Sequence, residues 1–269
     1  IALSINLNSG RFDFSLGSMA ALSSVLGAKI TYSILGGGSN SALMMLILTI
    51  LFGMLLGLVS GLMYVVLHLP PIITSLGVTL IYEGILFTIT EGRYVMKEVQ
   101  NPSMTAFTGS WIYAAIIIVV VIAIFDYTKF GYDYNALKNG QKVAVNTGIK
   151  EISNAIGCYV ICGGLMGIVG FLNATRSTTI NGGQLNFSSI SIMFTALFIG
   201  SYISRFTNEK IGFLLAALCM SMLNSTFAVF SNEVNASMQA IINAVLLVVF
   251  LIYLSNEHLL VSLFNGKRK

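Results

Sequence analysis

The sequence predicts an all-α polytopic membrane protein, and three observations carry this prediction. Hydrophobic residues make up 56% of the 269 residues and charged residues only 9%, whereas a soluble domain carries roughly 25% charged residues. The apolar residues gather into uncharged windows of about 20 residues, the length that crosses a hydrocarbon core. Three prolines against 26 glycines favour close-packed helices over the alternating strands of a membrane barrel. A soluble enzyme and a secreted disulfide scaffold are thereby excluded.

Eight such windows follow one another, which predicts about eight visible transmembrane helices. They cover residues 14–28, 41–67, 71–90, 106–125, 152–175, 186–204, 211–230 and 236–254. Glu83 is the only acidic residue within them. Residues 1–10 resemble the end of an earlier helix, and the chain starts without an initiator Met, so we expect a native N-terminal helix before residue 1. Cys158, Cys162 and Cys219 all fall in apolar runs and are expected to serve packing.

The placement of Lys and Arg predicts the orientation, because basic residues accumulate in cytoplasmic loops. If residues 266–269 lie inside, alternation places the long loop 126–151 inside as well, and ten of the 14 basic residues are then cytoplasmic. The four outer ones are Lys29, Arg93, Lys97 and Arg176. The net charge of +4 is therefore topogenic, and a nucleic-acid role is not expected.

An internal repeat divides the chain. The stretch 8–18 returns 173 residues later at 181–191, with Asp13 matched by Asn186. By the predicted topology the copies start at opposite membrane faces, so the repeat is inverted. We expect a single transmembrane domain over 1–269, with repeat one at about 8–125, repeat two at about 152–255 and a cytoplasmic loop at 126–151. Inverted repeats with broken helices indicate a transport pathway between the halves, although Gly, Ser and Asn also cap and pack membrane helices.

Polar residues at membrane depth are costly unless they face a partner or an aqueous path. The two repeat copies supply matching rows for such a path, although Ser hydroxyls also bond back to helix carbonyls. These candidates are Asp13, Ser15, Ser18, Asn186, Ser188 and Ser191.

Two further polar features lie in the predicted spans. Gln239 and Asn243 are four residues apart, and with Asn224 in the preceding helix they form either a pathway surface or an interhelical hydrogen-bond set. Three roles for Glu83 stay open: a neutral carboxyl at membrane depth, a partner of a basic residue, or a group directed at the aqueous path.

Catalytic constellations are absent from the sequence. The two histidines, His68 and His258, are far apart, so no metal site is predicted, and neither a phosphate loop nor a dinucleotide fingerprint occurs. We expect no catalytic residue and no cofactor in this chain.

Four sequence blocks resemble one known family. Residues 8–18 resemble the Ser-Gly-Ile-Asp-Leu-Ser-x-Gly-Ser signature of ribose-type (monosaccharide) ABC transporter permeases, a class that includes branched-chain amino acid permeases. Residues 69–77 with 81–84 are similar to its Ile-Pro-Pro-Phe-Ile-x-Thr-Leu-Gly and Tyr-Arg-Gly stretches, and 163–170 to its Gly-Leu-x-Ala-Gly-x-x-Gly helix. Residues 130–149 are similar to its Gly-Arg-x-x-x-Ala and Ala-Ala-x-x-x-Gly-Ile loop.

The resemblance implies a ten-helix permease in the bacterial cytoplasmic membrane, with its C-terminus cytoplasmic. Its implied partners are a cytoplasmic ATPase subunit that carries ATP and Mg, an extracytoplasmic substrate-binding protein, a second permease copy or paralogue, and membrane lipid. The implied solute is a monosaccharide such as ribose or a galactoside, with a nucleoside or branched-chain amino acid as the alternative. The implied ATPase coupling loop, which by itself also reads as a solvated connector, contains Gly131, Asn135, Ala136, Gly140, Ala144 and Gly148.

The chain departs from the family pattern in ways that concern partner and solute. Residues 138–145 lack the family's acidic pair, residues 190–195 lack an acidic counterpart, and Glu83 replaces a common Arg. Two rival classes stay open. A secondary transporter or channel would depend on Glu83 and Asp13, and a membrane enzyme would need a nucleophile or a metal set.

Overall fold

The computed structural model describes residues 1–36, 40–92, 110–176, 187–204, 207, 209–229 and 236–256, and every regular element within them is an α-helix. The helices fall into two compact units, Ala2–Asn186 and Phe187–Lys269. The predicted all-α polytopic class is confirmed. The single domain, the inverted relation of the repeats and the preceding N-terminal helix stay predictions, and residues 181–186 of the second repeat copy lie outside the described residues.

Helices form at every predicted window. The N-terminal unit contains α1 Ala2–Asn8, α2 Leu16–Leu35, α3 Ser41–Leu67, α4 Pro71–Ile89, α6 Ser110–Tyr127, α7 Lys129–Asn146 and α8 Glu151–Arg176. The C-terminal unit contains α9 Phe187–Ile203, α10 Glu209–Val229 and α11 Ala236–Ser255. The uncharged stretch before the first window is helical too, as α1.

The first window is longer than the sequence predicts. The predicted window stops before Lys29 because it contains only uncharged residues, but α2 continues to Leu35 and reaches 20 residues. The Lys29 ammonium donates a hydrogen bond of 2.7 Å to the carbonyl oxygen of Ile89, at the C-terminal end of α4. Because the cation meets a partly negative helix end, its charge does not end the helix.

Four helices within the described ranges are long and apolar enough to cross a membrane: α2, α3, α4 and α8. A fifth span arises if the bent pair α6 and α7 is counted, whose axes differ by 70°. The apolar parts of the C-terminal helices are shorter, at Met193–Ile203, Ile211–Phe227 and Ile241–Tyr253. The structure therefore contains both full-length and short apolar helices.

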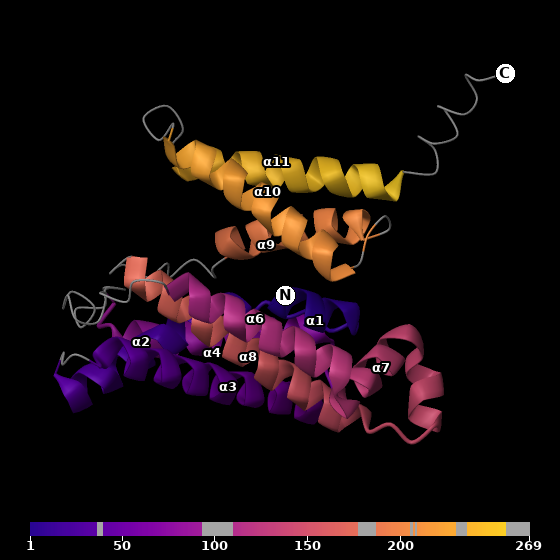
Figure 1. Ribbon diagram of the computed structural model, residues 1–269, viewed down its shortest axis with the longest axis horizontal. Coiled ribbons are helices and arrows are strands. Elements are labelled where there is room, and N and C mark those ends of the chain that lie inside the picture. The colour runs from indigo at the N-terminus through magenta and orange to yellow at the C-terminus, as the bar shows by residue number, and fades with distance from the viewer. Residues whose placement is uncertain are drawn as a thin grey trace. The chain divides into compact units, whose positions relative to one another are not determined.

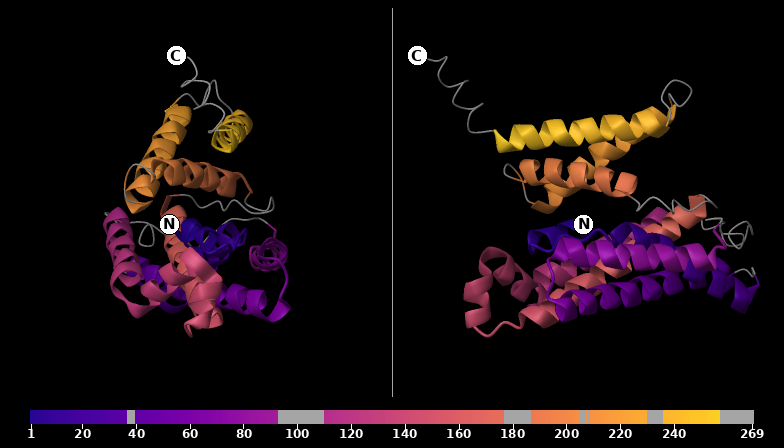
Figure 2. Two further views of the ribbon diagram at one scale, coloured as in Figure 1. Left: turned by 90° about the vertical axis from the view of Figure 1, so that its right-hand side faces the viewer. Right: turned by 180° about the vertical axis from the view of Figure 1, so that it is seen from behind.

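The N-terminal unit is built around α2 and α8. These two helices are largely buried, whereas α3 and α4 expose apolar side chains along much of their length, and the views in Figures 1 and 2 show α3 and α8 running side by side. Glycines line their crossing: a Cβ atom at Gly53 would strike the carbonyl oxygen of Gly163, and one at Gly57 would strike that of Tyr159. Small residues thus bring the two backbones into direct contact, as membrane helices require for close packing.

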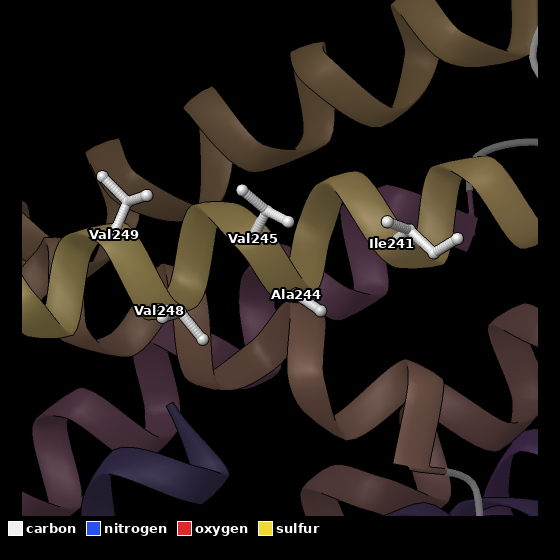
Figure 3. Close-up of a pocket in the computed structure, with 5 residues that line it drawn as sticks. All are labelled: Ile241, Ala244, Val245, Val248 and Val249. Carbon is white, nitrogen blue, oxygen red and sulfur yellow. The ribbon is translucent and has the colours of Figure 1, made fainter.

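The C-terminal unit packs α9 against both α10 and α11. The Tyr202 ring of α9 meets Phe250 and Tyr253 of α11 edge-on, and the Tyr202 and Tyr253 hydroxyls are 3.0 Å apart. Another face of α11 carries only carbon side chains around a shallow hollow, shown in Figure 3. Its lining residues are Ile241, Ala244, Val245, Val248 and Val249. This hollow offers no polar group to a polar solute.

Candidate functional site

The candidate site in the N-terminal unit is the turn between α1 and α2, residues 9–15. Two backbone hydrogen bonds close the end of α1. The amide of Gly10 donates to the Leu7 carbonyl at 2.9 Å, and the amide of Arg11 donates to the Asn6 carbonyl at 2.9 Å. This geometry needs a left-handed residue, and Gly10 supplies it with φ +71°. The Asn8–Ser18 signature therefore encodes a sharp helix break, as the sequence predicts.

The Asp13 carboxylate is the centre of this turn. It is buried, with 1% of its surface exposed. One oxygen, Oδ1, accepts from the Ser15 backbone amide at 2.9 Å and from the Ser15 hydroxyl at 2.6 Å. The other, Oδ2, accepts from the Asn6 side-chain amide at 3.2 Å. Since Ser15 is the residue that precedes α2, the carboxyl group holds the N-terminal end of that helix through hydrogen bonds.

Ionisable and phenolic groups of neighbouring helices surround the turn. Asp13 lies within electrostatic range of the hydroxyls of Tyr82 on α4 and Tyr159 on α8. The Arg11 guanidinium, 5% exposed, acts on Tyr159 as well. The turn is therefore a buried polar centre bordered by three helices, α2, α4 and α8.

Ser18 has a local partner. Its hydroxyl donates to the Ser15 carbonyl at 2.9 Å within the first turn of α2. This is the back-bonding that the sequence left open as the alternative to a conduit-lining role. The pathway role of Ser18 stays a prediction.

Glu83 and its neighbour Tyr82 occupy the buried face of α4. The Tyr82 hydroxyl donates to the Leu56 carbonyl at 2.6 Å, so the contact of 3.0 Å with Ser60 has the Ser60 hydroxyl as donor. These bonds join α4 to α3 beside Glu83, whose exposed fraction is 9%. The structure places Glu83 inside the unit; which of its three predicted roles applies stays open.

The second repeat copy is described only in part. Asn186 lies outside the described residues, and Ser188 and Ser191 fall within the backbone of α9 while their side chains lie outside the description. Their pathway roles stay predictions.

The polar residues of α10 and α11 come together as expected. The Asn224 side-chain oxygen accepts from the Gln239 amide at 2.9 Å and from the Asn243 amide at 3.3 Å. Asn243 is buried, with 1% exposure. One oxygen thus links two helices through two donors, which is an interhelical hydrogen-bond set. A pathway role for these residues remains a prediction.

The predicted coupling loop is a helix for most of its length. Helix α7 leaves α6 at an angle of 70°, and Gly140 interrupts its helical backbone with φ −176° and ψ 80°. It ends at a left-handed glycine, Gly148, whose amide donates to the Val145 carbonyl at 3.0 Å. Figure 1 shows α7 bending away beyond the end of α6.

The predicted coupling residues on and just after this helix divide into three groups by burial. Gly131 and Ala144 are buried against the unit, Ala136 and Gly140 are half-buried, and Asn135 and Gly148 are exposed. Exposed apolar side chains stand beside them, with 69% of Val143 and 42% of Val145 accessible. An exposed apolar patch on an otherwise polar helix is typical of a protein contact surface.

The first half of α7 is fixed to the unit by side chains that the sequence prediction missed. The Tyr134 hydroxyl donates to the Ile5 carbonyl of α1 at 3.0 Å, and the Asn154 amide of α8 donates to the Phe130 carbonyl at 3.2 Å. The Tyr134 and Phe125 ring centroids lie 4.9 Å apart in an edge-on arrangement. The presence of Tyr134 in the polar loop was the sequence signal for this contact, because buried Tyr hydroxyls take specific hydrogen-bond partners.

Comparison with known proteins identifies the family of this chain. Residues 1–253 match the family described as "branched-chain amino acid transport system / permease component". The chain is 25% identical over 222 residues to the autoinducer 2 import system permease protein LsrC of Photorhabdus luminescens, covering 79% of this chain and 65% of that protein. It is 20% identical over 219 residues to the protein of the same name from Yersinia pseudotuberculosis, covering 79% and 61%.

The chain therefore spans slightly less than two thirds of the length of these curated relatives. No solved structure matches it. The match over residues 1–253 covers the helix break at Asp13 and the kinked α7 alike, in agreement with the four sequence blocks. The chain belongs to the family of branched-chain amino acid transport system permease components.

Proposed function

We propose that this chain is the transmembrane permease subunit of a binding-protein-dependent ABC importer that carries a small polar solute across the bacterial cytoplasmic membrane. The observation that carries the proposal is α7, a kinked polar helix set at 70° to α6 and bearing exposed apolar side chains. Helices of this kind offer a docking surface to a soluble partner. The partner is a cytoplasmic ATPase subunit that holds ATP and Mg, since this sequence contains no phosphate loop.

The solute is a monosaccharide such as ribose or a galactoside, and a nucleoside or a branched-chain amino acid is the alternative. The relatives are named as permeases of an autoinducer 2 import system, which supports a small polar solute. A substrate-binding protein outside the cell supplies specificity, so the conduit need only avoid trapping the solute. Uncharged polar side chains, such as those of Ser188 and Asn224, suit a weakly binding path.

A second permease copy or a paralogue completes the conduit, with the C-terminus of each on the cytoplasmic side. Movement of α7 on the ATPase drives alternating access, in which one part of the bundle rocks against the other. The N-terminal unit contributes a rigid part for this motion, because the glycine-lined contact of α3 with α8 leaves no space for sliding side chains.

The test is co-purification. The full-length permease is expressed with its neighbouring ATPase, purified through a tag on the permease and placed in nanodiscs for assay of ATP hydrolysis. Deletion of residues 140–144 and the exchange Val143→Asp should both release the ATPase. Lys150→Ala, an exposed change beyond the end of α7, serves as the matched control and should retain it. A permease that purifies alone and conducts solute without ATP would overturn the proposal in favour of a secondary transporter or channel.

A further inference from the structure

A series of hydrogen bonds connects α7 to the helix break at Asp13. It starts at Tyr134, which is 6% exposed and whose hydroxyl donates to the Ile5 carbonyl at 3.0 Å. The Tyr134 ring is held edge-on by Phe125, with centroids 4.9 Å apart. The hydroxyl is therefore placed by packing of the ring, and it ties α7 to a residue 129 positions earlier in the chain.

The series continues from Ile5 through the next residue. Asn6 is fully buried; its side-chain amide donates to Asp13 Oδ2 at 3.2 Å and its carbonyl accepts the Arg11 amide at 2.9 Å. Asp13 Oδ1 then holds both the amide and the hydroxyl of Ser15. Each step joins hydrogen-bonded or adjacent residues, so the series runs without a gap from α7 to Ser15, the residue that precedes α2.

The turn between α1 and α2 contains a destabilising feature. Two buried polar atoms in it, Arg11 Nη1 and Asn6 Oδ1, have no hydrogen-bond partner within the described part of the chain. Burying a charged donor or an amide oxygen without a partner is unfavourable, and both atoms regain partners when the turn opens to water. The turn is therefore less stable than a fully bonded turn would be, which favours its opening when a contact that holds it is removed.

We propose that Tyr134 is a positioning residue that holds the Asp13 turn closed from α7, and that displacement of α7 releases it. This rests on the proposed function only for the source of the displacement, the ATPase cycle. The hydrogen-bond link between Tyr134 and the turn stands on the geometry of the N-terminal unit alone.

The first test uses Tyr134→Phe in the full-length permease, which removes the hydroxyl and retains the ring contact with Phe125. Hydrogen exchange of peptides covering residues 6–18 should accelerate roughly fivefold, the change expected for loss of one hydrogen bond. Tyr32→Phe is the matched control, since Tyr32 is 45% exposed on α2, and it should leave this exchange unchanged. Equal exchange in Tyr134→Phe and wild-type protein would overturn the proposal.

The second test separates coupling from simple stability in proteoliposomes that contain the permease, its ATPase and its binding protein. Tyr134→Phe should retain the ATPase and its hydrolysis rate while the solute taken up per ATP hydrolysed falls. A parallel loss of hydrolysis and uptake would overturn the positioning role. Failure of the ATPase to co-purify with wild-type permease would overturn the proposed function instead, and the exchange result would still decide on the link.

A second variant protects the test against poor recovery of the first. Asp13→Asn keeps a carbonyl oxygen for Ser15 but replaces Oδ2, the acceptor of the Asn6 side-chain amide, by an amide nitrogen. It should accelerate exchange over residues 6–18, and the double variant with Tyr134→Phe should exceed the larger single effect only slightly, because both act on one series. Fully additive effects would show that the two residues act independently and would overturn the proposal.

Discussion

Gly53 and Gly163 meet across the contact of α3 with α8 so closely that a Cβ atom on either glycine would strike the carbonyl oxygen of the other. The relationship is reciprocal, and the atoms in the way belong to the backbone. A side chain can rotate aside, but a helical carbonyl cannot move without breaking its own hydrogen bond. The two helices are therefore held at a distance that only glycine permits.

Gly163→Ala should lower the stability of the permease by about 1–3 kcal/mol, the range for overpacking a well-packed interior. The measurement is the midpoint of thermal unfolding in detergent, followed by size exclusion. Gly77→Ala is the control, because a Cβ atom at Gly77 on α4 has nothing within 4 Å. Equal unfolding temperatures for the two variants would contradict the close contact.

Gly10→Ala should cost roughly 1–2 kcal/mol, because Gly10 adopts φ +71° and a residue with a Cβ atom is strained there. The same thermal assay measures the loss, and hydrogen exchange should localise it to the end of α1. Gly10→Asn should lose less, since Asn tolerates the left-handed region better than Ala. If Asn were as damaging as Ala, the backbone angle would not be the reason for glycine.

Ser15→Ala should destabilise the start of α2 by about 0.5–1.5 kcal/mol, the range for loss of one hydrogen bond. Its hydroxyl donates to the Asp13 carboxylate at 2.6 Å. Ser23→Ala is matched in burial, but the Ser23 hydroxyl donates to the Ala20 carbonyl of its own helix. We expect Ser23→Ala to be nearly neutral; comparable losses in both variants would argue against a special role for the carboxylate.

Asn224→Leu should destabilise the contact of α10 with α11 by about 1–2 kcal/mol, because one oxygen serves both Gln239 and Asn243. Replacing all three residues by Leu should restore part of the loss, since no amide then remains without an acceptor. Thermal unfolding of the wild-type, single-variant and triple-variant proteins checks this, with Thr226→Val on the exposed face of α10 as the neutral comparison. A triple variant less stable than Asn224→Leu would contradict the explanation that amide donors without an acceptor cause the loss.

Much of the fold follows from hydropathy alone, because every long uncharged window becomes a helix and α3 begins and ends where its window does. The charge of Lys29 predicted too early an end for α2, because the partner of Lys29, the Ile89 carbonyl, lies 60 residues away. The spacing of Gly53, Gly57 and Gly61 at four-residue intervals held the signal for the contact with α8, but glycine spacing does not name the helix on the other side.

The candidate site was predictable where it is local. The break at Gly10, Asp13 and Ser15 depends on residues of one short stretch. Gln239 and Asn243 are four residues apart on one helix, and Asn224 lies on the preceding helix. The residues that were missed, Asn6, Tyr82 and Tyr134, obtain their roles from partners on other helices. Such long-range pairing depends on how helices are arranged, which a single sequence leaves undetermined.

ATP-dependent uptake tests the central claim most directly. The full-length permease with its ATPase is reconstituted in proteoliposomes loaded with ATP and Mg, and radiolabelled ribose is added outside together with the binding protein. The account predicts uptake that requires both internal ATP and the binding protein, and that is abolished by deletion of residues 140–144. Solute flux of the same rate without ATP or ATPase would contradict it and direct the next mutation to Glu83.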